Sequence, residues 1–207
     1  MLRKAKAIEA WPFPHIVIED ALPDEIYREL KQTRPLVPGE GFNKRFDISA
    51  SESLEMDLPD IWREFISYHC SKDFYEEVNS LFNLNLEGKV GVRCRDRCKI
   101  EMDCQISINT PGEGRVCIAH RDNPISRWSG LFYMGTDDAG LEIYDCPKPE
   151  WFGKRRVSNP GPAVKTIPFK DNIFIGFENV EHAIHAPESR DHAVQRHFVN
   201  FCIDQKP

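Results

Sequence analysis

Histidine and carboxylate side chains at metal-ligand spacing are the first chemical feature of the sequence. His120 and Asp122 are separated by a single residue. Residues two apart on a β-strand project from the same face, so a strand that ends here would place an imidazole beside a carboxylate. Two histidines and one carboxylate on one triangular face, with three positions open, are typical of non-haem Fe(II) centres. The pair therefore predicts two of three ligands to Fe(II), the third coming from elsewhere in the chain.

Two histidines nearer the C-terminus are the candidates for the third ligand. His182 and His185 are an odd number of residues apart, so on a strand they would face opposite sides. Only one of them can then point toward the metal. Their spacing alone leaves the choice open.

Short strands that could position these residues follow one another from about residue 89. Eight segments have alternating or wholly apolar character and are separated by turn residues, a pattern typical of a sandwich or barrel. The expected strands are Glu101–Asn109, Arg115–His120, Trp128–Met134, Gly140–Tyr144, Ala163–Pro168, Ile173–Phe177, Ala183–His185 and Gln195–Ile203. Asp171-Asn172 predicts a tight hairpin turn between two of them.

Helical patterns dominate the part of the chain before these strands. After a short strand at His15–Ile18, Pro23 to Arg34 has the acidic start and apolar spacing of a helix. Residues 36–58 have the composition of a loop. Residues 59–82 return to helical spacing in two stripes, and Ser71 between them predicts a second helix start.

Helices followed by many strands predict an α+β protein. We expect a double-stranded β-helix (jelly roll) with the N-terminal helices packed on one sheet. The 207 residues suit one domain over 1–207, with a helical part to about residue 88 and a jelly-roll core from about 89 to 207.

Composition excludes several classes of partner. The net charge is −6 and the acidic residues are dispersed, which argues against binding to nucleic acid or to an anionic membrane surface. No apolar run is long enough to span a bilayer, and no apolar segment follows the basic start as in a signal peptide. We therefore expect a cytoplasmic protein.

Cysteines favour the same compartment. There are seven, an odd number, and most lie in apolar runs where a free thiol behaves as a small hydrophobe. Cys94, Cys98 and Cys104 lack the second cysteine pair of a structural zinc site, so zinc is not predicted.

The segment around His120 carries a family resemblance. It reads Asn109-Thr-Pro-Gly-Glu-Gly-Arg-Val-Cys-Ile-Ala-His120-Arg-Asp-Asn-Pro124. The Pro-Gly-x-Gly turn, five residues, His-x-Asp and Asn-Pro together resemble the prolyl 4-hydroxylase-like branch of the 2-oxoglutarate- and Fe(II)-dependent dioxygenases, without a gap from Pro111 to Pro124. The resemblance extends over residues 11–34 and 101–203. Residues 36–100 show no specific match.

The resemblance implies a ligand set and a cosubstrate site. His185 follows Phe177 by eight residues and precedes a small residue, as the family's distal ligand does, which favours it over His182. Arg196 lies eleven residues further on and opens the last strand, where the family places the cation that binds 2-oxoglutarate. An arginine fork suits that role because it binds a carboxylate through two parallel hydrogen bonds.

Two further residues are weaker members of this site. Tyr133, in Leu131-Phe-Tyr-Met-Gly, resembles the tyrosine that donates its hydroxyl to the same carboxylate, although it could instead simply fill the core. Asn200 shares a strand face with Arg196 and is expected to line the pocket.

By this resemblance, the chain is expected to use Fe(II), 2-oxoglutarate and O2 to hydroxylate an unactivated C–H bond, with release of succinate and CO2. The substrate is left open between a peptidyl residue, prolyl included, and a small molecule such as an amino acid. A groove at the pocket mouth around Arg121, Arg127 and Trp128 would favour a peptide, and a closed pocket a small molecule. The alternative function is a non-catalytic jelly-roll sensor or binding module that binds metal and 2-oxoglutarate.

Overall fold

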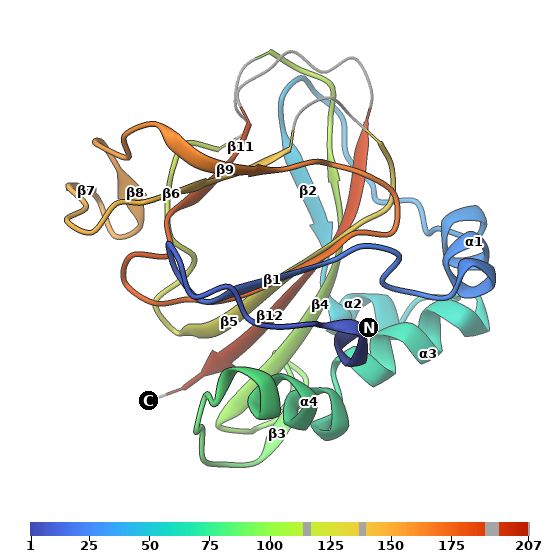
Figure 1. Cartoon of the computed structure of the whole chain (residues 1–207). Helices are drawn as coiled ribbons and strands as arrows, with labels where there is room; N and C mark the ends of the chain where they lie inside the picture. Colours follow the sequence, from blue (N-terminus) through green and yellow to red (C-terminus); the bar gives the residue numbers. More distant parts are fainter. Residues whose placement is uncertain (114–116, 137–139, 189–194, 207) are drawn as a thin grey trace.

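A curved major sheet forms the largest part of the computed structural model, which describes residues 1–113, 117–136, 140–188 and 195–206 (Figure 1). Its strands run in the order β1-β10-β5-β12-β4-β2, all antiparallel, and β3 adds to β4 in parallel. The strands are β1 (His15–Ile18), β2 (Arg45–Ile48), β3 (Val90–Val92), β4 (Ile100–Asn109), β5 (Ser126–Tyr133), β10 (Phe174–Glu178) and β12 (Arg196–Gln205).

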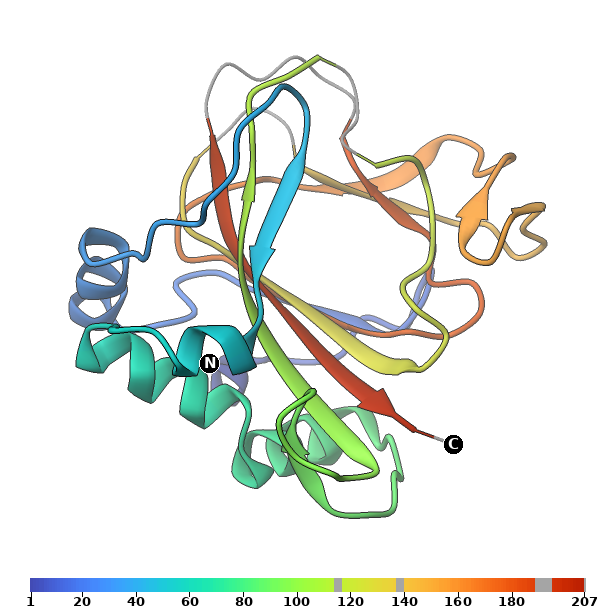
Figure 2. The same ribbon diagram turned by 180° about the vertical axis from the view of Figure 1, so that it is seen from behind.

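A smaller sheet faces the major sheet across a common interior (Figures 1 and 2). It contains β6 (Leu141–Tyr144), β9 (Ala163–Ile167) and β11 (His185–Pro187) in the order β11-β6-β9. A two-stranded hairpin, β7 (Trp151–Phe152) and β8 (Arg156–Val157), lies between β6 and β9 in the sequence. Two facing antiparallel sheets confirm the predicted jelly roll.

Helices cover the outer face of the major sheet (Figures 1 and 2). They are η1 (Leu2–Lys4), α1 (Asp24–Gln32), α2 (Ala50–Leu54), α3 (Asp60–His69) and α4 (Lys72–Phe82). Ser71 accepts a hydrogen bond from Phe74 N and caps α4, as predicted. No helix in the described ranges is both long and apolar enough to cross a bilayer.

Successive side chains of each strand in the major sheet point alternately toward the helices and toward the interior between the sheets. On β12, Val199, Phe201 and Ile203 pack among the helix side chains. Arg196 and Asn200, on the opposite face, line an interior cavity. Burial of each large apolar side chain contributes roughly 1.5–3 kcal/mol, so the outward face fixes which side chains point inward.

The loop predicted for residues 36–58 is wrong, because β2 and α2 lie within it. β2 is an edge strand with two charged residues among four, which hides the apolar alternation of a strand. α2 has only five residues, too few for a helical period, but its capping box of Ser49 and Glu52 was a readable signal.

The strand predicted for Arg115–His120 is also wrong where the structure describes it. Cys117 to Ala119 belong to no strand, and His120 forms only isolated bridges. Residues 114–116, including the last glycine of the Pro-Gly-x-Gly turn, lie outside the described residues. Strands β3, β7 and β8 were not predicted because segments of two or three residues show no periodicity.

The hairpin predicted at Asp171-Asn172 is a corner between sheets instead. β9 and β10, on either side of it, belong to different sheets. Asn172 has a left-handed backbone (φ 61°), and its side chain bonds both backbone groups of Leu22. Local turn chemistry was read correctly, but it cannot show which sheet each flanking strand joins.

Candidate metal centre and cavity

The side chains of His120, Asp122 and His185 converge on one point. One potential ligand atom from each lies within 4.8 Å of the other two, and no second such group occurs among the residues that the structure describes. Asp122 Oδ1 is 3.7 Å from Nε2 of both histidines. Two atoms bound to one ion at about 2.1 Å are at most about 4.2 Å apart, so the two 3.7 Å distances suit a shared metal ion.

Backbone pairing holds the two histidines opposite each other. His120 N donates to His185 O at 3.0 Å, and His185 N donates to His120 O at 2.9 Å. Residues that exchange both backbone bonds in this way carry their side chains on one face, about 5 Å apart. A single antiparallel bridge therefore positions the His120 side chain, which a full strand was predicted to do.

Each imidazole is oriented by its second nitrogen. His120 Nδ1 lies 2.8 Å from Ile118 O, and His185 Nδ1 lies 3.1 Å from Ala183 O. A carbonyl accepts only from a protonated nitrogen, so each Nδ1 carries a proton, and in the neutral imidazole the Nε2 lone pair is then left for a metal ion. This outer hydrogen bond is what histidines that bind metals usually make.

The Asp122 carboxylate is held in its ionised form. Burial acts to raise its pKa, but attraction to the imidazoles of His185 and His120 in their protonated form outweighs that cost, aided by the charge of Arg45. The pKa of Asp122 therefore lies below its ordinary value. The carboxylate is available as a ligand at neutral pH.

His185 rather than His182 reaches this group. His185 is 5% exposed and opens β11, whereas His182 lies on an exposed turn. β11 begins only at His185, so the strand alternation expected for the two histidines does not extend to His182.

His120, Asp122 and His185, called the metal group below, line a cavity of about 710 Å³. Arg196, Tyr133 and Asn200 line the same cavity. Arg196 is 3% exposed, and its guanidinium lies 5.8 Å from the centre of the Phe169 ring. Tyr133 is 4% exposed, and its ring lies 4.2 Å from that of Phe169. The structure thus places Arg196 and Tyr133 at one apolar end of the cavity.

Tyr133 keeps its proton at this end. Burial raises the pKa of its hydroxyl, and the positive charge of Arg196 opposes that rise without cancelling it. A protonated phenol can donate a hydrogen bond to an acceptor bound nearby. Tyr133 also packs in the apolar cluster between the sheets, as its core-filling alternative predicted.

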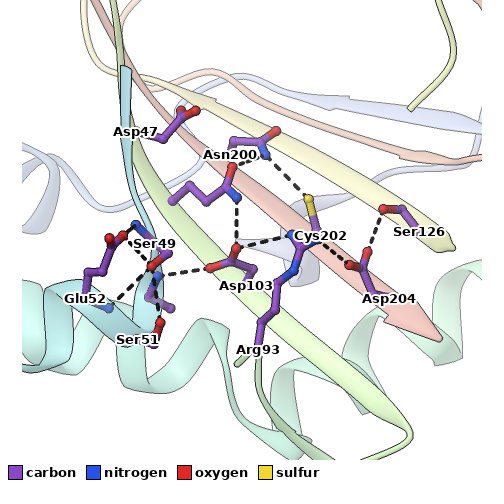
Figure 3. Close-up of polar contacts among 12 residues, drawn as sticks. Asp47, Ser49, Ser51, Glu52, Arg93, Asp103, Ser126, Asn200, Cys202 and Asp204 are labelled. Atoms are coloured by element: carbon purple, nitrogen blue, oxygen red, sulfur yellow. Dashed lines mark hydrogen bonds and ion pairs between the residues drawn. The ribbon is translucent and has the colours of Figure 1, made fainter. Parts of the chain in front are cut away.

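A polar network covers the inner face of the major sheet on another side of the cavity (Figure 3). Gln105 Nε2 donates to Asp103 Oδ2 at 2.8 Å, and Asn200 Nδ2 donates to Gln105 Oε1 at 2.9 Å. Arg93 lies between two buried carboxylates, 3.5 Å from Asp103 Oδ2 and 3.1 Å from Asp204 Oδ2. These contacts fix the cavity-lining amides of Gln105 and Asn200.

Sequence reasoning missed most of this network. The signal was present in β4, where Asp103, Gln105, Ser107 and Asn109 alternate with apolar residues. Such alternation on a central strand marks a polar interior face, because the other face packs on the helices.

The expected pocket mouth is partly wrong. Trp128 is fully buried against Phe74 and Phe82 on the helix side of the sheet, so it does not reach the cavity. Arg121 stacks on Trp151 of β7, with its guanidinium 5.4 Å from the ring centre. Arg155 and Arg156 of the β7–β8 hairpin, which pairs with the backbone around His120, also line the cavity.

Comparison with known proteins supports the fold. No family profile and no curated protein sequence matches the chain. Among solved structures, a Pseudomonas putida prolyl-4-hydroxylase is similar over 93% of this chain and 92% of its own (TM-score 0.56, 13% identity). The 2-oxoglutarate-dependent carbocyclase SnoK of nogalamycin biosynthesis is similar over 99% and 82% (TM-score 0.57, 10% identity).

A viral collagen prolyl hydroxylase from Paramecium Bursaria Chlorella virus-1 is similar over 93% of this chain and 96% of its own (TM-score 0.51, 14% identity). The chain therefore has the fold of the 2-oxoglutarate- and Fe(II)-dependent oxygenases, as the resemblance in sequence predicted. Within that class, the prolyl 4-hydroxylase-like arrangement is among those it matches along nearly its whole length.

Proposed function

We propose that the chain is an Fe(II)- and 2-oxoglutarate-dependent oxygenase that hydroxylates a C–H bond of its substrate. The observation that carries this proposal is the convergence of His120, Asp122 and His185 in a cavity that also contains a buried arginine, Arg196. A metal group without such a cation would not point to 2-oxoglutarate.

The three side chains fit Fe(II) in type, number and orientation. Two imidazoles with free Nε2 atoms and one ionised carboxylate form the donor set of non-haem Fe(II) enzymes, which leaves three positions for other ligands. Bound there with 2-oxoglutarate, Fe(II) would supply the activation of O2 that oxidises a substrate while 2-oxoglutarate becomes succinate and CO2.

The apolar end of the cavity fits the remote carboxylate of 2-oxoglutarate. Arg196 would bind that carboxylate through its guanidinium, and the Tyr133 hydroxyl would donate a hydrogen bond to it. Phe169, in contact with both residues, would exclude water from the carbon chain of the bound ligand. Structures with the same fold contain such ligands, including HygX with nickel and 2-oxoglutarate and the viral hydroxylase with 2-oxoglutarate.

Metal binding and turnover test the proposal with one variant and one matched control. His120→Ala should abolish Fe(II) binding and Fe(II)-dependent succinate formation from 2-oxoglutarate. His182→Ala removes an exposed histidine just before β11 and should retain both. Anaerobic titration with Fe(II) and 2-oxoglutarate measures binding, and chromatography measures succinate.

No metal binding by the unaltered protein, or equal loss in the two variants, would contradict the proposal. Binding of Fe(II) and 2-oxoglutarate without O2 consumption would instead support the non-catalytic sensor or binding module.

A further inference from the structure

The β7–β8 hairpin forms a wall of the cavity next to the metal group. Its backbone is tied to the segment that carries His120: Arg121 N donates to Arg155 O at 3.0 Å, and Val157 N donates to Ala119 O at 2.9 Å. The hairpin is therefore held by the same chain segment that presents the candidate metal ligand His120.

Pairing also determines where one hairpin side chain points. Arg156 and His120 are partners in an antiparallel bridge, and bridge partners carry their side chains on one face. Arg155 and Arg156 both line the cavity. We call these two residues the hairpin arginines.

The charged side chains that line the cavity are mostly positive. Arg45 and Arg93 also line it, but each is paired with a carboxylate, Asp47 and Asp204 respectively. The hairpin arginines and Lys44 line it without an ion pair to any residue that the structure describes.

This excess stands out in a chain whose net charge is −6. Lys44 immediately precedes β2, which lies across the barrel from the β7–β8 hairpin (Figure 1). Positive charge on two sides of a cavity raises the local concentration of anions within it.

We propose that the hairpin arginines bind a carboxylate or phosphate group of the primary substrate, so that this site takes a small anionic molecule. Guanidinium forks bind both groups through two hydrogen bonds at once. A cavity of about 710 Å³ falls within the usual range for small-molecule sites. The inference rests on the proposed function, because it assigns the substrate of the same metal centre.

Matched pairs of an anionic and a neutral probe test whether the cavity prefers anions. The protein is loaded with Ni(II) and saturating 2-oxoglutarate, which fills the Arg196 end without turnover. Phenyl phosphate is compared with phenol, and phenylacetate with phenylacetamide, by calorimetric titration. At least one anionic probe should bind at least tenfold more tightly than its partner, and the pair that shows this preference distinguishes phosphate from carboxylate.

Two variants locate the binding site. The double variant Arg155→Gln/Arg156→Gln should lose the tenfold preference. Lys154→Gln removes one positive charge from the turn of the same hairpin, at a residue that does not line the cavity, and should keep it. Equal binding within both pairs, or an equal loss in the Lys154 variant, overturns the inference.

Failure of the inference can be told apart from failure of the proposed function. Affinities for Ni(II) and 2-oxoglutarate are measured first, and their absence contradicts the proposed function alone. The probes are also titrated into protein without metal, where the hairpin arginines should still favour the anions. Thermal unfolding of each variant confirms that it folds, as expected for substitutions of exposed side chains.

Discussion

Arg196 is the residue on which recognition of the cosubstrate depends in this proposal. It opens β12 and is nearly inaccessible to solvent, in contact with the Phe169 ring. A buried guanidinium gains from a bound carboxylate because little water competes for either group. Its contribution should therefore exceed that of an exposed arginine.

Replacing Arg196 should weaken 2-oxoglutarate binding. A hydrogen bond to a charged group contributes about 1.5–3 kcal/mol, so Arg196→Gln should raise the dissociation constant roughly 10- to 150-fold. Arg196→Lys should lose less, since it keeps the charge but not the fork. Calorimetry with Ni(II)-loaded protein measures the change. Arg127→Gln, on an exposed position of β5, serves as the control and should bind normally.

At the scale of elements, α3 connects the helical layer to the major sheet. Trp62 is fully buried, and its Nε1 donates to Leu30 O of α1 at 3.0 Å. Phe65 and His69 of the same helix contact Phe201 of β12. One helix face therefore supports the strand whose other face carries Arg196.

Loss of the Trp62 side chain should destabilise the whole protein. Trp62→Ala should lower the free energy of unfolding by about 3–5 kcal/mol, because it leaves a cavity and an unpaired carbonyl. Glu64→Ala, on the exposed face of the same helix, should change it by less than about 0.5 kcal/mol. Urea unfolding at constant pH measures both, and similar values for the two variants would contradict this role for α3.

His69 should make stability depend on pH. Burial lowers its pKa from 6.5 to about 3 in the folded protein. The unfolded chain therefore binds a proton at His69 across this window while the folded protein does not, so stability falls as the pH falls from 6.5 to 3. The slope from this one group is at most about 1.4 kcal/mol per pH unit.

Replacement of His69 tests this dependence. In His69→Leu, the difference in unfolding free energy from the unaltered protein should shift in favour of the variant as the pH is lowered from 6.5 to 4. His182→Leu, at an exposed position, should show no such trend. Parallel pH profiles for His69→Leu and the unaltered protein would exclude His69 as the cause.

At the scale of the whole molecule, the candidate ligands join separate parts of the jelly roll. His185 belongs to the small sheet, Asp122 precedes β5 of the major sheet, and His120 bridges to the β7–β8 hairpin. A ligand that binds all three favours the folded state, because the unfolded chain does not hold them together.

Metal and 2-oxoglutarate should therefore raise the unfolding temperature. A ligand at 100 times its dissociation constant stabilises by about 2.7 kcal/mol, which corresponds to roughly 5–10 °C for a chain of this size. Scanning calorimetry with Ni(II) and 2-oxoglutarate should show the shift in the unaltered protein and in His182→Ala. His185→Ala should not show it.

Local patterns were sufficient for much of the fold. The helices α1, α3 and α4 have enough length to show apolar periodicity, and β4 and β12 are long strands with clear alternation. Elements too short for a period, such as β2 and α2, were missed. The corner at Asn172 was misread because partners in a sheet are set by contacts far along the chain.

The sequence by itself identified the candidate residues for binding a metal and a carboxylate, since residue type, the His-x-Asp spacing and the arginine that opens β12 are all local. Only the tertiary structure decided that His185 rather than His182 meets Asp122, and that the β7–β8 hairpin places Arg156 beside His120. The physical reason is that both outcomes depend on backbone pairing between segments distant in the chain, which local composition does not encode.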